Sequence, residues 1–195
     1  DRLLSLPLTT VLFLKHLEHV HVEVDLDGRT ETSSWRIERD RLDGNDWRKT
    51  AGITSGGMYR VSVTTDDGSG ARFLIAHDDA IRIGQHRAGL SGPAWEGVNL
   101  TEVSVAVLDT EDDPSDIENA WRRFHVFLPT EQRSPYPFLV NGAFTTDLSR
   151  QQIRVTEDPR DYNACLIREA ARLFRVELLE FLLDRGTDVA LAALE

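Results

Sequence analysis

Arg150 is the residue whose type and position best suit chemistry. It follows an apolar strand predicted at residues 138–144, and Ser149 and Gln152 fit a capping box, in which the serine oxygen caps a helix and the glutamine reaches back. A guanidinium held at such a helix start can donate two parallel charge-assisted hydrogen bonds to a phosphate bound by a neighbouring domain. The helix dipole makes a cation mildly unfavourable there, and local rules tend to be broken at functional sites. The alternative is an ordinary surface arginine.

A glycine-containing motif, Asp66-x-Gly68-x-Gly70, is a second candidate, because it resembles the glycine-rich box of a nucleotide pocket. Such a short motif indicates a pocket only in the right structural context. Here the strands predicted at residues 59–65 and 71–76 flank it and pair naturally with each other. We therefore predict a hairpin turn rather than a nucleotide site.

The histidines and the single cysteine give little support to metal binding or to nucleophilic catalysis. His16, His19 and His21 lie where the chain changes from predicted helix to predicted strand, and no cysteine or acidic cluster completes a metal shell, so we predict no metal site. Cys165 lies among apolar residues of a predicted helix, and we expect a buried core residue. No Ser-His-Asp or Cys-His grouping can be argued from residue order, so a self-contained hydrolase is not favoured.

The composition indicates one globular unit with an acidic surface. A chain of 195 residues makes one large domain or one and a half small ones. The net charge of −11 argues against nucleic acid as a partner, because neutralising phosphates requires a basic surface. The apolar start, DRLLSLPLTTVLFLKHL, is too short and too interrupted for a membrane span, so we expect no membrane partner. One cysteine fits a reducing compartment, which predicts a cytoplasmic location.

The hydrophobic periodicity predicts a sheet followed by helices, which is an α+β fold. Residues 8–18 are predicted to form a helix, and residues 20–26 alternate apolar and polar side chains as a strand does. A long helix is predicted from a cap at Asp158-Pro159 to about Asp184, with Gly186 as its stop. Further strands are predicted at residues 34–39, 59–65, 71–76, 100–108, 123–128 and 138–144.

Three short motifs between residues 124 and 163 carry a family resemblance. They are Phe127-Leu128-Pro129-Thr130, Pro137-Phe138-Leu139-Val140 and Leu148-Ser149-Arg150. In this order they resemble the middle, or transducer, domain of the GHKL ATPases, the superfamily of gyrase, heat-shock chaperones, histidine kinases and MutL. The sacsin-like branch is most similar, and heat-shock chaperones share the Leu-Ser-Arg element. A looser likeness extends to residues 12–24.

The resemblance implies a fold of the ribosomal protein S5 domain 2-like type, with helices on one face of a mostly antiparallel sheet. It implies that residues 1–18 form a helix that connects to a missing N-terminal ATPase domain, and that residues 19–195 form the transducer domain. In the family, the arginine matching Arg150 reaches the terminal phosphate of ATP in the preceding domain, which would make Arg150 catalytic. Asn141, Ser149 and Gln152 are expected to surround Arg150 and contact the cofactor. ATP and magnesium would be bound mainly by the missing domain.

Two functions follow as competing hypotheses. In the first, the chain relays the nucleotide state of an adjacent ATPase domain, is not an enzyme alone, and acts on a protein client or as a homodimer. In the second, it is a non-catalytic interaction module of the same fold, with the acidic block at residues 101–118 and the long helix binding a protein. A MutL-like role on DNA is disfavoured by the charge. The sequence upstream of Asp1 separates the first two, because only an ATPase carries an Asn-bearing helix and an Asp-x-Gly-x-Gly box there.

Overall fold

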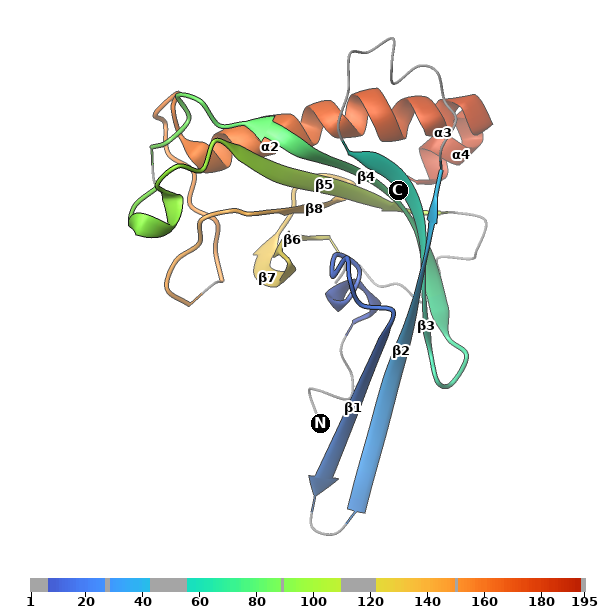
Figure 1. Ribbon diagram of the computed structural model, residues 1–195. Helices are drawn as coiled ribbons and strands as arrows, with labels where there is room; N and C mark the ends of the chain where they lie inside the picture. The colour runs from blue at the N-terminus through green and yellow to red at the C-terminus, as the bar shows by residue number, and fades with distance from the viewer. Residues whose placement is uncertain are drawn as a thin grey trace.

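The computed structural model describes residues 7–26, 29–42, 56–88, 90–109, 122–149 and 151–193. It is an α+β structure in which one open sheet is followed along the chain by helices, as Figure 1 shows. The predicted α+β class is therefore confirmed. The eight strands are β1 His19–Leu26, β2 Arg29–Arg41, β3 Gly57–Thr65, β4 Gly70–Arg82, β5 Leu100–Leu108, β6 Arg123–Val126, β7 Leu128–Arg133 and β8 Leu139–Gly142.

Strands β1 to β5 form a meander, in which each strand pairs antiparallel with the next. The order along the sheet is β1-β2-β3-β4-β5-β8-β6-β7, so the last strand in sequence lies between β5 and β6. The β6–β8 pair is parallel, and the other pairs are antiparallel. Each predicted strand overlaps an observed one, but the strand predicted at residues 123–128 runs across the turn between β6 and β7. β7 was not predicted as a separate strand.

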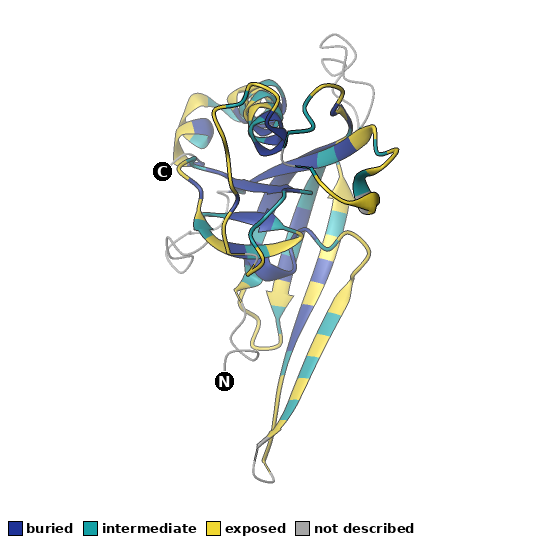
Figure 2. Cartoon of the chain, turned by 90° about the vertical axis from the view of Figure 1, so that its left-hand side faces the viewer, coloured by how far each residue is buried: buried dark blue, intermediate teal, exposed yellow. Residues whose placement is uncertain are grey.

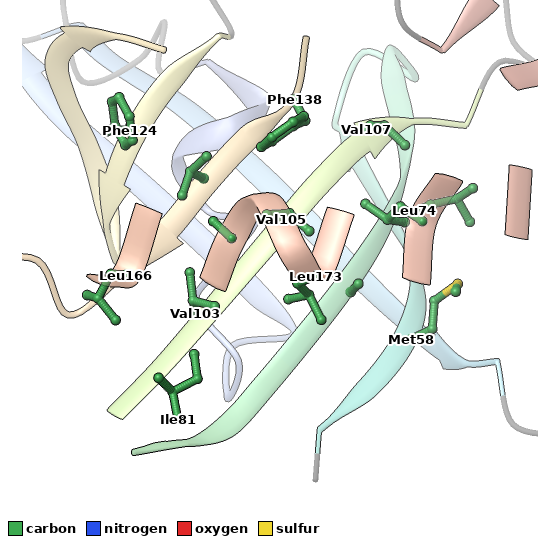
Figure 3. Packing of buried hydrophobic residues seen from close by; sticks show 14 of the residues in the cluster. Met58, Leu74, Ile81, Val103, Val105, Val107, Phe124, Phe138, Leu166 and Leu173 are labelled. Atoms are coloured by element: carbon green, nitrogen blue, oxygen red, sulfur yellow. The ribbon is translucent and has the colours of Figure 1, made fainter. Parts of the chain in front are cut away.

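The C-terminal helices cover one face of the sheet (Figure 1). They are α2 Tyr162–Leu173, a π-helical stretch η4 Phe174–Leu179, α3 Glu180–Arg185 and α4 Thr187–Ala192. The core beneath them combines residues of β4, β5 and β8 with the helix residues Leu166 and Leu173, both fully buried (Figure 3). Truncating either leucine to alanine removes a fully packed side chain and costs about 2–5 kcal/mol.

The long terminal helix has a capping residue at its start and a glycine at its end, but the capping residue is not the predicted one. The N-cap is Asp161, whose Oδ1 accepts a hydrogen bond from the Ala164 N–H at 2.7 Å, rather than the predicted Asp158. Asp158 instead closes the preceding turn, because its Oδ1 accepts from the Arg160 N–H at 2.8 Å. Gly186 ends the helix with a φ of +136°, a value that side chains rarely adopt, so its role as the stop is confirmed.

The opposite face of the sheet is covered by the N-terminal segment. Val11, Leu12 and Phe13 are buried there against Trp35 and Phe73. Figure 2 shows that the buried residues are concentrated in the centre of the sheet. No helix in the described part of the chain has the length and apolar character to span a bilayer.

The helix predicted at residues 8–18 is wrong. Only a single 3₁₀ turn, η1 Leu8–Thr10, forms, and turns follow it. Three consecutive side chains, Val11 to Phe13, are buried together, which one face of a helix cannot achieve. The carbonyls of Leu14 and Leu17 accept hydrogen bonds from the Arg39 guanidinium at 2.9 and 2.7 Å, so a side chain of β2 holds this segment in its non-helical path.

Candidate functional site

The segment on either side of Arg150 is a turn rather than a helix start. Thr146 and Ile153 pair as an isolated antiparallel bridge, and the Asp147 N–H donates to the Gln152 carbonyl at 3.1 Å. The predicted capping box at Ser149 is therefore wrong. Asp147 supplies the capping oxygen, because its Oδ1 accepts from the N–H groups of Gln151 at 2.9 Å and Gln152 at 3.4 Å. Since the bridge closes the turn at Ile153, no helix propagates from it.

The Asp147 carboxylate organises this turn. Desolvation is the largest influence and raises its pKa, but the hydrogen bonds from the Gln151 N–H, the Ser149 side chain and the Gln152 N–H together hold the pKa of Asp147 below its ordinary value. The carboxylate is thus charged at neutral pH, with several donors of its own turn gathered on it. The Ser149 side chain and the Gln152 backbone N–H both donate to Asp147, and these bonds fix the shape of the turn.

The base of the turn is anchored to the rest of the fold by two buried or half-buried amides. Asn163, buried in the first turn of α2, accepts from the Thr145 N–H at 2.9 Å and donates to the carbonyls of Thr145 and Arg154 at 2.7 and 2.8 Å. The Gln132 side chain of β7 accepts from the Ile153 N–H at 2.6 Å. Both ends of the turn are therefore held, one by a helix and one by the sheet.

The tip of the turn is exposed. Four residues of the tip are exposed, and the Leu148 side chain is fully exposed. The four are Leu148, Ser149, Gln151 and Gln152. The predicted catalytic residue, Arg150, lies outside the described residues. Asn141 differs from the other predicted site residues, because it is fully buried on β8. Its Oδ1 accepts from the Phe127 N–H at 2.9 Å, so its contact is with the β6–β7 turn.

A row of buried polar side chains crosses the sheet on the face opposite the helices, and the sequence analysis did not identify it. His77 pairs with Ser104 on β5, Ser104 with Asn141 on β8, and Asn141 with His125 on β6. All are buried, and they replace apolar residues at inward positions of otherwise apolar strands. A polar residue at an inward position is the signal that the sequence offered, but only the register shows that these residues form one row.

One end of this row opens into a cavity of about 160 Å³ lined by Lys15, Arg39, Tyr59 and His77, among others. The Lys15 Nζ lies 3.0 Å from His77 Nε2 and 2.5 Å from Glu102 Oε2. An ammonium can only donate, so Nε2 accepts, and His77 Nδ1–H donates to Ser104 Oγ at 2.9 Å. Burial, and then the Lys15 charge, lower the pKa of His77.

This tautomer decides what the His77–Ser104 pair can do. In a serine nucleophile the histidine takes a proton from the hydroxyl, which requires a ring nitrogen that accepts from it. Here the ring nitrogen beside Ser104 already carries the proton. The pair is therefore a structural hydrogen bond rather than an activated nucleophile.

The other end of the row contains polar atoms without hydrogen-bond partners in the described structure. Both ring nitrogens of His125 and the Nδ2 of Asn141 are buried and unpartnered. The His125 ring is fully buried and packs edge-on against Phe13, with 5.0 Å between ring centroids. Burial, followed by the charge of Arg123, lowers the pKa of His125 to about 3, so the ring is neutral at neutral pH.

The glycine-containing motif is a hairpin turn between β3 and β4, as predicted. The Thr65 N–H donates to the Ser69 carbonyl at 2.8 Å, and Gly68 has a φ of +83°. Asp67 Oδ1 accepts from the Thr65 hydroxyl at 2.5 Å and the Ser69 N–H at 2.9 Å. These bonds, with that from Thr65 the largest cause, lower the pKa of Asp67 to about 2.

The remaining predicted residues are placed as follows. Cys165 is buried in α2, as expected, with 5% of its surface exposed. His16, His19 and His21 are exposed, and the described residues contain no group of His, Cys, Asp and Glu side chains that converges as metal ligands. Comparison with protein-family models, with curated proteins and with solved structures gives no match for this chain.

Proposed function

We propose that this chain is the transducer domain of a GHKL-type, sacsin-like ATP-binding protein. In this proposal the turn at residues 147–152 presents Arg150 to the terminal phosphate of ATP held by an adjacent N-terminal domain. The observation that carries it is the turn itself, which has an exposed tip and a base fixed by Asn163 and Gln132. A side chain must be held in place to stabilise charge on another body, because a flexible one must first be ordered.

The donor set of the turn fits one phosphate contact rather than a complete nucleotide pocket. The N–H groups of Gln151 and Gln152 are directed to Asp147, so they are not free for a phosphate. In the proposal, Ser149 and Gln152 are therefore positioning residues, and Asn141 acts only through Phe127. Magnesium-bound ATP, held mainly by the other domain, would supply the phosphoryl group and the metal charge. This chain contributes the guanidinium and the frame that aims it.

Other observations support the wider proposal. Helices on one face of a mostly antiparallel sheet agree with an S5 domain 2-like fold. A net charge of −11 disfavours nucleic acid as a partner. A single buried thiol suits a cytoplasmic protein.

The proposal is tested on the full-length protein with Arg150→Ala. A charge-stabilising contact to the transition state is worth about 3 kcal/mol, so ATP turnover should fall on the order of a hundredfold. ATP affinity should fall much less, because the contact is completed only on domain closure. Arg150→Lys should rescue poorly, since a point charge does not reproduce the planar fork.

The matched control is Arg154→Ala, which removes the same charge from an exposed residue just beyond the turn. It should leave turnover near the wild-type rate. Asp147→Ala should lower kcat more than it changes KM, and Asp147→Asn should rescue partly, because an amide oxygen still accepts from Gln151 and Gln152. Wild-type turnover in the Arg150→Ala protein would refute the arginine's role.

A second candidate is a non-catalytic interaction module of the same fold. It is favoured by exposed apolar side chains, since Leu148 is fully exposed and the adjacent residues Phe127 and Leu128 are 41% and 50% exposed. Exposed apolar residues that cluster mark interaction sites. In this case Leu148→Ser would weaken partner binding, whereas Arg150→Ala would change neither binding nor turnover.

A further inference from the structure

The β1–β2 hairpin projects beyond the rest of the sheet. β2 pairs with β3 only from Trp35 to Arg41, whereas it pairs with β1 from Arg29 onwards. The distal half of the hairpin is therefore a two-stranded ribbon, which extends away from the body in Figure 1. An isolated two-stranded ribbon is marginally stable in water, and an added strand would stabilise it.

β1 is the edge strand of this ribbon and of the whole sheet. Within the described residues it pairs with β2 alone. An open edge presents unpaired N–H and C=O groups that another strand can join. The strand contains no proline, so nothing in its backbone blocks such an addition.

Exposed and half-buried residues alternate strictly along β1, as the colours along this strand in Figure 2 show. Val20, Val22 and Val24 are half-buried on one face. On the other face, the exposed residues are two histidines followed by two acids, namely His19, His21, Glu23 and Asp25.

This order is self-complementary about Val22. If a second β1 pairs antiparallel with Val22 opposite its own copy, His21 faces Glu23 and His19 faces Asp25 across the junction. Val20 faces Val24 on the other side of the ribbon. An imidazole N–H donates to a carboxylate whether the ring is neutral or protonated, so each pair is favourable. A shift by two residues would place acids opposite acids or histidines opposite histidines.

We propose that two copies of this chain associate through β1, antiparallel and centred on Val22. The junction converts two marginal ribbons into one four-stranded ribbon with the valines of both copies on one face. Because the shared strip is narrow, the dimer is weak and concentration-dependent. The proposal stands apart from the proposed role of Arg150 and uses none of its residues.

Disulfide crosslinking of the whole chain tests the register. Directly opposite residues in an antiparallel pair have Cα atoms about 4.5–5.5 Å apart, within the range that a disulfide spans. Val22→Cys should therefore crosslink to its own copy under mild oxidation. Val24→Cys is the matched control, because its copies lie four residues apart, or about 13 Å. The wild-type chain is the blank, since Cys165 is buried.

A charge exchange tests the complementarity by sedimentation equilibrium. His21→Glu places acid opposite acid twice, and it should weaken dimerisation on the order of tenfold. The double variant His21→Glu with Glu23→His restores both pairs and should recover the wild-type dissociation constant. His16→Glu and Glu38→His, which make the same changes at exposed positions outside β1, should have no effect.

The expected result is rapid crosslinking at position 22, at least tenfold slower crosslinking at position 24, and recovery in the exchanged double variant. Equal crosslinking at both positions would refute the register. A chain that remains monomeric at high micromolar concentration, with no crosslinking at position 22, would refute the dimer and leave the alternating charges as a device that blunts the edge.

Discussion

The side-chain Oδ1 of Asn141 accepts a hydrogen bond from the Phe127 N–H at 2.9 Å, and Phe127 is the only described non-glycine residue with a positive φ, at +63°. The left-handed region costs a bulky side chain about 1–2 kcal/mol. A buried amide on β8 thus holds the turn between β6 and β7 in a conformation that its own residue disfavours. Asn141, first considered as a cofactor contact, has a defined structural partner.

The positive φ of Phe127 predicts that, at this position, asparagine is more stabilising than valine, the reverse of the order expected from apolar character. Asparagine tolerates the left-handed region, whereas a β-branched residue is strained there. We expect Phe127→Asn to be more stable than Phe127→Val by about 1 kcal/mol, although valine is the more apolar. Urea denaturation of both variants measures the difference, and equal or greater stability of the valine variant would contradict the assignment of strain.

The buried, neutral ring of His125 should make the free energy of unfolding fall at acidic pH. Its folded-state pKa is about 3, far below the ordinary value near 6.5, so between these values the unfolded chain binds a proton that the folded chain does not. The stability due to neutral His125 is therefore complete above pH ~6.5 and is lost as the pH falls toward 3. Between pH 6.5 and 5 the loss should be about 2 kcal/mol.

His125→Leu tests this dependence. It removes two buried unpartnered nitrogens, so the variant should be more stable than wild type at pH 7 by about 1–3 kcal/mol. Its stability should also fall less between pH 6.5 and 5, and the lowered pKa of His77 should account for part of the slope that remains. His16→Leu, at an exposed position, serves as the control. An unchanged slope in the His125→Leu protein would show that this ring is not the sensor.

Cys165 should react slowly with thiol reagents in the folded chain. It is 5% exposed, and burial raises the pKa of its thiol, which lowers the fraction of reactive thiolate. Ser149→Cys introduces a thiol on the exposed turn and should label at once under the same conditions. Equally rapid native labelling of Cys165 would mean that α2 detaches readily from the sheet.

This chain alone should bind ATP negligibly. The Asp66–Gly70 loop closes β3 onto β4, and the Asp67 carboxylate is engaged within it and stays charged, which repels phosphate. Titration calorimetry with ATP and magnesium measures this, and micromolar affinity would assign a nucleotide site to the chain that the hairpin does not explain.

The sequence predicted those strands and helices whose hydrophobic residues repeat with one regular spacing. Alternation located β1, runs of apolar residues located most other strands but not β7, and the apolar face with Gly186 located the terminal helix. The helix predicted at residues 8–18 does not form, because Val11, Leu12 and Phe13 are all buried against the face of the sheet and Arg39 donates to the carbonyls of Leu14 and Leu17. The capping box at Ser149 failed because Asp147, two residues earlier, competes for the same N–H groups.

The candidate sites were less predictable because they depend on register between distant strands. The four residues of the buried polar row are far apart in sequence, namely His77, Ser104, Asn141 and His125. No local sequence pattern indicates that β8 lies between β5 and β6. The complementarity of β1 was visible as alternation, but its meaning required the knowledge that β1 lies at the edge.

The insertion of β8 between β5 and β6 also determines the order in which the strands can pair while the chain is being synthesised. The meander from β1 to β5 can pair strand by strand as it leaves the ribosome, but the free edge of β5 has no partner until Leu139 to Gly142 emerges after β6 and β7. During that interval Val105 and Ala106, which end fully buried, lie at an open strand edge. Nascent chains that stall before Leu139 are thus the species most prone to aggregate.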